Sequence, residues 1–331
     1  MLVLGVETSC DETSVAIVRD GKEVLANVVY TQIDIHKKFG GVVPEVASRE
    51  HVGKISIVFE EAFQKANVTF SDIDLVAVTH HPGLIGSLLV GINAAKAFAM
   101  AHGIKYVEVD HIKGHIYANY IESDFKFPLL ALVVSGGHTE LVLMKDHYQF
   151  EVLGQTLDDA VGETYDKVGR VMGLDYPAGP IVDKLALNGE VTYKLPFVYL
   201  DKNDFNFSFS GLKSAVINLI NTANMKSEDI NIPNLCASFQ NSAVRVLVDK
   251  AIQAAKQYNV KQVVIAGGVA ANKGLRGLLK EEVDKLEGVT LSFPPMKYCT
   301  DNAAMIAVVG YFKHKVQSIW KRSWFIGSFS V

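Results

Sequence analysis

The chain has 331 residues, of which 49% are hydrophobic and 21% charged, and its formal net charge is −4. This composition excludes a disordered chain, and the length corresponds to about two domains of ordinary size. The slightly acidic balance excludes a protein that binds nucleic acid through its overall charge, so any such surface would be a local patch.

Three cysteines, Cys10, Cys236 and Cys299, lie far apart in the sequence. They form no CxxC pair, so we expect neither a disulfide scaffold nor a cysteine zinc site, and the pattern is typical of a reducing compartment. The longest apolar runs, Leu84–Val90 and Pro128–Val134, are shorter than the about 20 residues that a membrane span needs. No basic leader precedes the first apolar segment, so we expect a cytoplasmic protein without a membrane partner.

Hydrophobic patterning predicts a similar order of elements twice along the chain. Apolar and β-branched runs bounded by turn residues indicate strands, and a repeat of about 3.6 residues indicates helices. In the first part we expect strands at 2–6, 14–18, 23–30 and 75–79 and helices at 45–66 and 87–101. In the second part we expect strands at 129–134, 140–144, 150–153 and 263–266 and a helix at 272–286.

The second copy carries an insertion of largely helical sequence between about residues 158 and 250. An internal duplication of this kind predicts two similar α/β lobes with a cleft between them. A single doubly wound sheet is the alternative that the pattern leaves open.

Polar and glycine-rich turns recur at equivalent points of the two copies. They are Glu7–Thr13, Ser135–Thr139 and Gly267-Gly268, the last before a helix that starts near Asn272. Backbone N–H groups and small hydroxyls in such turns can face an anion, and a helix N-terminus adds to this. None of the turns matches the P-loop or the GxGxxG fingerprint, so ordinary NTPase and dehydrogenase functions lose support.

His111 and His115 are four residues apart, so in a helix they lie on one face, as a shared metal ion requires. Asp301, near the start of another predicted helix, is a candidate third ligand. Two imidazoles and one carboxylate leave metal positions open for substrate, and iron(II) and zinc both fit. Ile112 follows the first histidine, so the glutamate base of an HExxH protease is missing. The alternative is a pair of structural histidines.

A series of motifs resembles one family in order and spacing. They are LGVETSCDET at Leu4–Thr13, GGVVPE at Gly40–Glu45, His111–His115, SGGHTEL at Ser135–Leu141, SFSGLK at Ser208–Lys213, ASFQ at Ala237–Gln240, GGVAAN at Gly267–Asn272 and CTDNAAM at Cys299–Met305. From residue 2 to about residue 310 the chain is similar to the bacterial TsaD (Gcp) family, the catalytic subunits of tRNA threonylcarbamoyladenosine synthase.

The resemblance implies the actin-like ATPase (ASKHA) fold, an α/β architecture of two duplicated lobes. The first lobe is expected over residues 1–125, completed by a C-terminal helix at about 302–331, and the second over 126–301, with the helical insertion at about 158–250. The implied activity is that of a metal-dependent acyltransferase in tRNA processing. It moves the threonylcarbamoyl group from threonylcarbamoyl-AMP to N6 of the adenosine 3′ of the anticodon in tRNAs reading ANN codons, which forms t6A and releases AMP.

The family's functional residues carry over to positions of this chain. The implied ligands of one divalent ion, Fe²⁺ or alternatively Zn²⁺, are His111, His115 and Asp301. The implied substrate-binding residues are Val134, Ser135, Gly136, Gly137, His138, Asp166, Gly179, Asp183 and Asn272. Because an exocyclic adenine amine is a poor nucleophile, we expect positioning and oxyanion stabilisation to supply most of the acceleration. We hypothesise that Asp11 or Glu12 helps to remove the N6 proton; alternatively these acids only order their turn.

The chain departs from the family pattern at a few places. His80-His81-Pro82-Gly83 stands where a Gly-Pro-Gly turn is usual, and Ala178 replaces a glycine. The basic C-terminal residues Lys313, Lys315, Lys321 and Arg322 form either a tRNA phosphate contact or a solvated face.

The resemblance also implies partners: a TsaB-like paralogue of the same fold, a TsaE-like ATPase and an upstream enzyme that makes the adenylate. Three other functions compete with the transferase. They are a glycoprotein endopeptidase, for which no water-activating base is visible, a non-catalytic nucleotide-binding scaffold, and a sugar or acetate kinase, in which the histidine pair would have no role.

Overall fold

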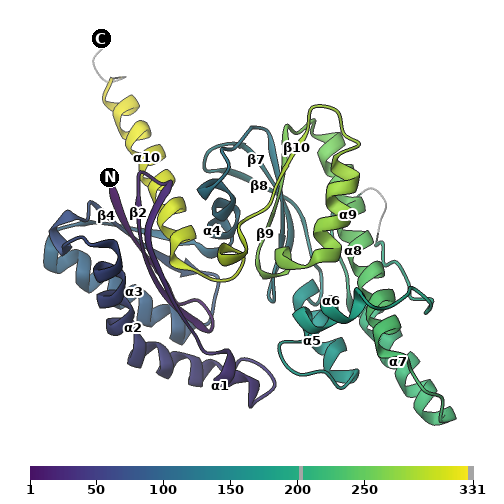
Figure 1. Ribbon diagram of the computed structural model, residues 1–331. Helices are drawn as coiled ribbons and strands as arrows, with labels where there is room; N and C mark the ends of the chain where they lie inside the picture. The colour runs from purple at the N-terminus through teal and green to yellow at the C-terminus, as the bar shows by residue number, and fades with distance from the viewer. Residues whose placement is uncertain (201–203, 327–331) are drawn as a thin grey trace. The chain divides into compact units, whose positions relative to one another are not determined.

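The computed structural model describes residues 1–200 and 204–326, with side chains up to residue 318. The chain forms two compact units (Figure 1). The first contains Met1–Asp124, His147–Gln149 and the residues from Thr300 onward, and the second contains Phe125–Asp146 and Phe150–Cys299. Residues 327–331 of the expected C-terminal helix, and the side chains of the basic residues Lys321 and Arg322, lie outside this description.

The first unit is built on a five-stranded mixed sheet in the order β3-β2-β1-β4-β5. Its strands are β1 (Leu2–Glu7), β2 (Glu12–Arg19), β3 (Glu23–Thr31), β4 (Leu75–His81) and β5 (Lys105–Asp110). The first three strands pair antiparallel through short turns, whereas β4 and β5 run parallel to β1. Parallel neighbours need a crossover, which helices supply in this unit.

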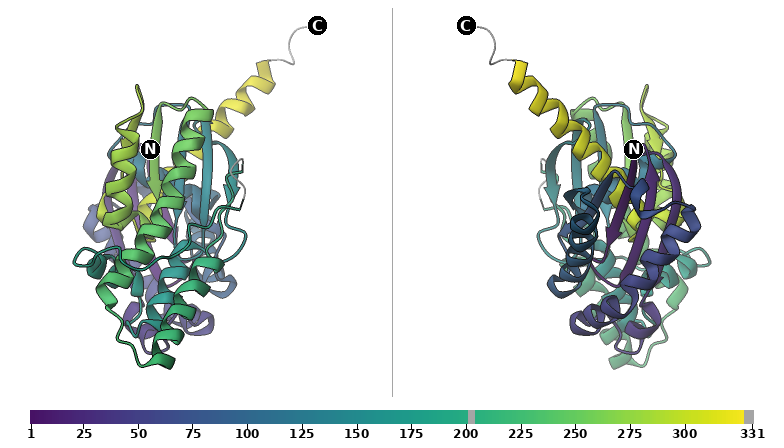
Figure 2. Two further views of the ribbon diagram at one scale, coloured as in Figure 1. Left: turned by 90° about the vertical axis from the view of Figure 1, so that its right-hand side faces the viewer. Right: turned by 90° about the vertical axis from the view of Figure 1, so that its left-hand side faces the viewer.

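Helices cover both faces of this sheet (Figures 1 and 2). The helices of this unit are α1 (Ile33–Lys37), α2 (Pro44–Ala66), α3 (Ile85–His102), α4 (His111–Ala118) and α10 (Ala303–Ile326), with 3₁₀ turns η1 (Phe70–Asp72) and η2 (Asn119–Ile121). Of these, α2, α3, α4 and α10 pack on the strands. Because side chains alternate along a strand, Leu4 and Val6 of β1 share one core with Val58 of α2 and Ile92 of α3. Gly5 faces the other way and allows α10 to lie directly on β1.

Within the described residues, α3 is the one helix long and apolar enough to cross a membrane by length and composition. The apolar runs considered from the sequence are shorter, because Gly91, Asn93 and Lys96 interrupt them. One face of α3, with Leu88 and Ile92, is buried in the core of the first unit. A buried core helix can have the same length and apolar composition, so these two properties are weak evidence for a membrane span.

The second unit repeats the strand order of the first. Its sheet runs β10-β9-β6-β7-β8, with β6 antiparallel to β7 and parallel to β9, and β9 parallel to β10. The strands are β6 (Leu129–Val134), β7 (Thr139–Asp146), β8 (Gln149–Gln155), β9 (Gln262–Ala266) and β10 (Thr290–Ser292). The helices are α5 (Val161–Val171), α6 (Ala178–Ala186), α7 (Ser210–Lys226), α8 (Ile232–Gln257) and α9 (Lys273–Val283), with η3 (Gly268–Ala271) and η4 (Met296–Tyr298).

The duplication expected from the sequence is confirmed, because β6, β7, β8, β9 and β10 take the places of β1 to β5. A single doubly wound sheet is excluded. The helical insertion is also confirmed, since α5 to α8 lie between β8 and β9. Strands β5 and β10 were not predicted: β5 alternates charged and apolar residues at a sheet edge, and β10 has only three residues.

The packing of α10 on β1 predicts the effect of a single methyl group. A Cβ at Gly5 would lie 2.2 Å from the backbone oxygen of Ala303 and 2.9 Å from the nitrogen of Ala307, and backbone atoms cannot move aside. We expect Gly5→Ala to lower the free energy of unfolding by about 1–3 kcal/mol in urea titrations. As a control, a Cβ at Gly53 in α2 meets nothing within 4 Å, so Gly53→Ala should leave stability unchanged or raise it by up to about 1 kcal/mol. Equal effects of the two substitutions would contradict close packing at Gly5.

Candidate functional site

Helix α4 carries the histidine pair and starts directly where strand β5 ends. Asp110, the last residue of β5, caps the helix because its carboxylate accepts a hydrogen bond from the Lys113 backbone N–H at 3.0 Å. His111 and His115 are therefore one turn apart on a capped helix, and both side chains are buried.

The two imidazoles meet the carboxylate of Asp301, which lies just before α10. The Nε2 atoms of His111 and His115 are 3.1 Å apart, and Oδ1 of Asp301 lies 3.1 Å from Nε2 of His115 and 3.4 Å from Nε2 of His111. Asn302, not Asp301, caps α10, because its side-chain oxygen accepts from the Met305 N–H at 3.1 Å. Asp301 is thus available to the cluster, and the structure brings together the three predicted ligands.

The separations of these three atoms fit a bound cation. Ligand atoms at about 2.0–2.2 Å from one metal ion lie about 2.9–3.5 Å from each other. Moreover, two ring nitrogens that face each other at 3.1 Å can share only one proton between them. A divalent ion satisfies both nitrogens and the carboxylate at once, so His111, His115 and Asp301 form a suitable donor set.

A buried carboxylate orients the first histidine. Oε2 of Glu7 lies 3.0 Å from Nδ1 of His111, and Glu7 also accepts hydrogen bonds from the Ser9 backbone N–H at 2.5 Å and from the hydroxyl of Thr79. This contact holds the proton of His111 at Nδ1 and leaves Nε2 directed at the cluster. Nδ1 of His115 is buried and has no hydrogen-bond partner among the described residues.

The charges of the cluster explain its pKa values. Burial opposes ionisation of Glu7 and Asp301, but the neighbouring His111 outweighs it and lowers the pKa of both carboxyls, with His115 adding to the effect on Asp301. Burial likewise opposes a charge on His111, yet Asp301 and Glu7 raise the pKa of His111 well above its usual value. Negative charge therefore surrounds the site, which favours a cation there.

Asp11 and Glu12 lie at the start of β2 and are almost fully buried. Burial, with the charges of Asp301 and Asp11, raises the pKa of Glu12 well above its usual value, although the Thr31 hydroxyl donates to its carboxyl at 3.1 Å. Burial therefore disfavours the ionised form of Glu12. Asp11 and Glu12 belong to the first unit, which also contains the His–His–Asp cluster.

The predicted substrate turn joins β6 and β7 in the second unit. Ser135 N–H donates to the carbonyl of His138 at 2.8 Å, and His138 N–H donates to the Ser135 hydroxyl at 3.0 Å. Gly136 and Gly137 are exposed, and a Cβ on either would meet nothing within 4 Å. Neither has a positive φ, so the backbone conformation at these two positions does not require glycine. Val134 is fully buried, so only its backbone could contact a ligand.

Asp183 and Asn272 join one buried network through a residue that the sequence argument did not single out, Gln240. The Gln240 amide donates to Asp183 at 3.1 Å and accepts from Asn272 at 2.8 Å. Asp183 also accepts from the backbone N–H groups of Lys273 and Gly274, the first residues of α9. The expectation that the N-terminus of α9 faces a ligand anion is therefore wrong, because a carboxylate of the chain occupies it. The motif ASFQ was the available signal for Gln240.

Asp166 and Gly179 meet at the start of α6. The Asp166 carboxylate accepts from the backbone N–H groups of Ala178 at 2.7 Å and Gly179 at 3.4 Å, so it caps this helix. Burial raises the pKa of Asp166, although these two hydrogen bonds act against it. Oδ1 of Asp166 is thus used in capping α6, which leaves Oδ2 for other contacts.

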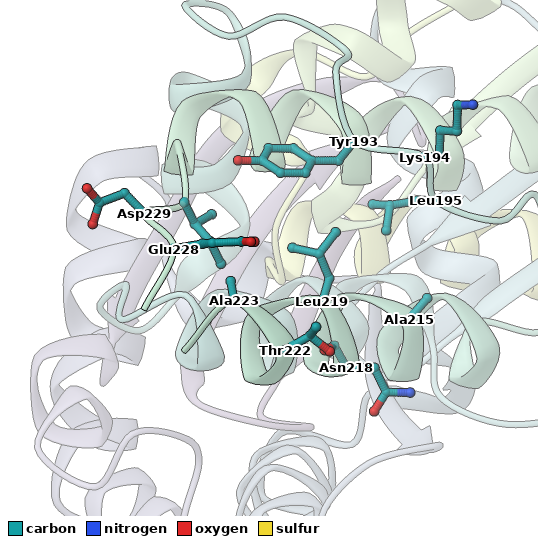
Figure 3. Close-up of a pocket in the computed structure, with 11 residues that line it drawn as sticks. Tyr193, Lys194, Leu195, Ala215, Asn218, Leu219, Thr222, Ala223, Glu228 and Asp229 are labelled. Carbon is teal, nitrogen blue, oxygen red and sulfur yellow. The ribbon is translucent and has the colours of Figure 1, made fainter. Parts of the chain in front are cut away.

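A pocket of about 490 Å³ lies elsewhere in the second unit, between α7 and the segment around Tyr193. Figure 3 shows Tyr193 and Leu195 on one side and Leu219 of α7 on the other. Glu228 and Asp229 also line it. None of the predicted site residues lines this pocket.

The duplicated sheets define the class of the fold, the actin-like ATPase fold. Component A of (R)-2-hydroxyglutaryl-CoA dehydratase from Acidaminococcus fermentans is similar with a TM-score of 0.55 at 17% identity, over 95% of this chain and 98% of that chain. A full-length HypF structure is similar with a TM-score of 0.63 at 14% identity, over 95% of this chain and 46% of that chain. At these identities the likenesses show the fold alone.

Sequence comparison gives the family. The TsaD family, tRNA N6-adenosine threonylcarbamoyltransferase, matches residues 23–308. The tRNA N6-adenosine threonylcarbamoyltransferase of Bacillus subtilis (strain 168) is 61% identical over 310 residues, which cover 94% of this chain and 90% of that protein. The chain belongs to this transferase family, as its motifs predicted.

The position of Glu7 predicts a test of the cluster. Glu7→Gln removes the charge that holds the His111 ring while keeping its shape, so we expect metal affinity to fall by about 10- to 100-fold with the fold retained. Competition with a chromophoric chelator measures this affinity. The surface variant Glu45→Gln, at an exposed ion pair with Arg49, is the control and should bind metal normally. Unchanged affinity in Glu7→Gln would show that Glu7 does not orient His111.

Proposed function

We propose that this protein transfers the threonylcarbamoyl group of threonylcarbamoyl-AMP to N6 of the adenosine 3′ of the anticodon in tRNAs reading ANN codons, with release of AMP. Membership of the transferase family supports the reaction. The observation that carries the site is the convergence of His111, His115 and Asp301 on one point.

His111, His115 and Asp301 would hold one divalent ion, which we propose to be Fe²⁺, with Zn²⁺ as the alternative. When bound, such an ion supplies a Lewis acid for an oxygen of the acyl donor. Glu7 fixes the ring of His111, and the acidic surroundings concentrate cations at this point. Neither the distances nor the donor types distinguish the two metals.

The second unit supplies the proposed donor-binding residues. The turn formed by Ser135, Gly136, Gly137 and His138 suits the phosphate, because the backbone N–H groups of the exposed Gly136 and Gly137 can donate to an anion, while those of Ser135 and His138 bond within the turn and hold its shape. Gln240 holds Asp183 and Asn272 in place. Asp166, Gly179 and Val134 complete the proposed set through their backbones or their remaining acceptor atoms.

We assign proton removal from N6 to Asp11 rather than Glu12. A base must be ionised before it can accept a proton, and burial raises the pKa of Glu12 and so disfavours its ionised form. Asp11 lies beside Glu12 and is also almost fully buried. AMP is a good leaving group, so no strong acid is required at the other side of the bond.

The proposed partners are tRNA, a TsaB-like paralogue and a TsaE-like ATPase, and the proposed location is the cytoplasm. The exposed face of α3 supports an apolar protein partner, because Ile85, Leu89 and Met100 lie on it with 78%, 51% and 83% of their surface accessible. An endopeptidase lacks support because no HExxH glutamate follows His111, and a kinase would leave the cluster unused.

The transfer assay tests the proposed function. Metal-loaded protein, its partners, threonine, bicarbonate, ATP and unmodified tRNA should yield t6A by nucleoside mass analysis. The double variant His111→Ala/His115→Ala should lose on the order of 100-fold or more of this activity. His102→Ala is the control, because His102 is an exposed histidine at the end of α3 that packs against Phe98 and is not part of the cluster. Full activity of the double variant would exclude the cluster from the reaction, and nucleotide binding without any transfer would indicate the scaffold function.

The two acids give a second prediction. Asp11→Asn should lower kcat by about 10²- to 10⁴-fold with little change in the KM for the acyl donor, because the variant cannot accept the N6 proton. Glu12→Gln resembles the protonated acid and should retain most activity. Steady-state kinetics with preformed threonylcarbamoyl-adenylate measures kcat and KM for both variants and so distinguishes their effects. Full activity of Asp11→Asn would remove this role from Asp11.

A further inference from the structure

Two neighbouring histidines, His80 and His81, end strand β4 and take no part in the cluster described above. Their side chains are 47% and 62% exposed. Neighbouring residues of a strand normally point to opposite faces. Here the pairing of β4 with β5 shifts register between Thr79 and His81, and such an irregularity re-aims side chains. Both rings consequently lie beside carboxylates of β5.

Each ring contacts one carboxylate through its Nε2 atom. Nε2 of His80 lies 3.5 Å from Oε2 of Glu108, and Nε2 of His81 lies 3.3 Å from Oδ2 of Asp110. Nζ of Lys96 lies 3.3 Å from Oε1 of Glu108, so the ion pair with Lys96 uses a different oxygen from the contact with His80. A carboxylate at Nε2 favours the tautomer with its proton there, and the lone pair is then on Nδ1.

The two Nδ1 atoms face each other at 3.3 Å, with the rings almost perpendicular at 85°. Two ligand nitrogens at about 2.0–2.1 Å from a tetrahedral zinc ion are about 3.3 Å apart. A carboxylate behind each imidazole is the arrangement that orients metal-binding histidines and raises their basicity. Without a cation, a hydrogen bond between the two Nδ1 atoms requires a proton on one of them.

We propose that His80 and His81 form a second, solvent-exposed site for a divalent cation of the zinc class. The ion binds to the two Nδ1 atoms, and water completes its coordination. The buried cluster has three protein ligands, one of them a carboxylate, whereas this site has two neutral ones, so it binds the ion more weakly.

Asp110 connects the two sites. Its Oδ2 atom faces His81, while its Oδ1 atom caps α4, the helix that starts with His111. The sites can nevertheless be separated by substitution, because the exposed rings of His80 and His81 contact none of the buried ligands. Glu108→Gln tests the carboxylate support without disturbing the cap.

Zinc stoichiometry tests the proposal. Metal-free protein is titrated with zinc chloride, and bound zinc is measured by equilibrium dialysis and calorimetry. We expect a tight and a weaker equivalent in the unchanged protein, loss of the weaker one in His81→Ala and in His80→Gln, and loss of the tight one alone in His115→Ala. Glu108→Gln should weaken the second site about tenfold or more.

His102→Ala is the matched control for an exposed histidine and should bind both equivalents. A single equivalent in the unchanged protein would overturn the proposal. A weaker equivalent that survives in both His80→Gln and His81→Ala would overturn it as well. These outcomes do not depend on transfer activity, so they are independent of the proposed function.

Discussion

The hydrogen bond between Glu7 and His111 is the contact on which the candidate metal centre depends. Glu7 is fully buried at the end of β1, and His111 begins a helix at the end of β5, two strands away in the sheet. An isolated carboxylate in this position would be costly, whereas a carboxylate paired with an imidazole is stable. The pair ties the central strand of the first sheet to the helix that carries both histidines.

The actin-like architecture makes this contact possible. Parallel strands β1, β4 and β5 end at the same edge of their sheet, so residues that follow them meet there. Asp301 joins them because α10 packs on β1, where Gly5 permits backbone contact. His115 and Asp301 are thus 186 residues apart in sequence, and their Nε2 and Oδ1 atoms are 3.1 Å apart in space.

The sequence predicted the duplicated fold well, because the same order of strands, turns and helices is written twice in the hydrophobic pattern. It missed β5 and β10, since short or edge strands carry few apolar residues. Spacing and resemblance identified His111, His115 and Asp301 as candidate metal ligands. Their roles in metal binding stay predictions.

The contacts behind the site were harder to predict. Nothing in the sequence pairs Glu7 with His111 or Gln240 with Asp183, because such contacts arise only when distant elements pack. Burial also raises the pKa of Glu12, and the burial of a single polar residue has no periodic signature in the sequence. The sequence likewise contains no sign that the N-terminus of α9 is already hydrogen-bonded, because the carboxylate that bonds to it, Asp183, belongs to the distant helix α6.

X-ray absorption spectroscopy of protein loaded with one equivalent of zinc tests the metal centre most directly. Two imidazole nitrogens at about 2.0–2.1 Å and a carboxylate oxygen at about 2.0–2.2 Å should appear in the first coordination sphere, and one imidazole should disappear in His115→Ala. A sphere of oxygen atoms alone, or an unchanged spectrum in His115→Ala, would show that these residues do not bind the ion.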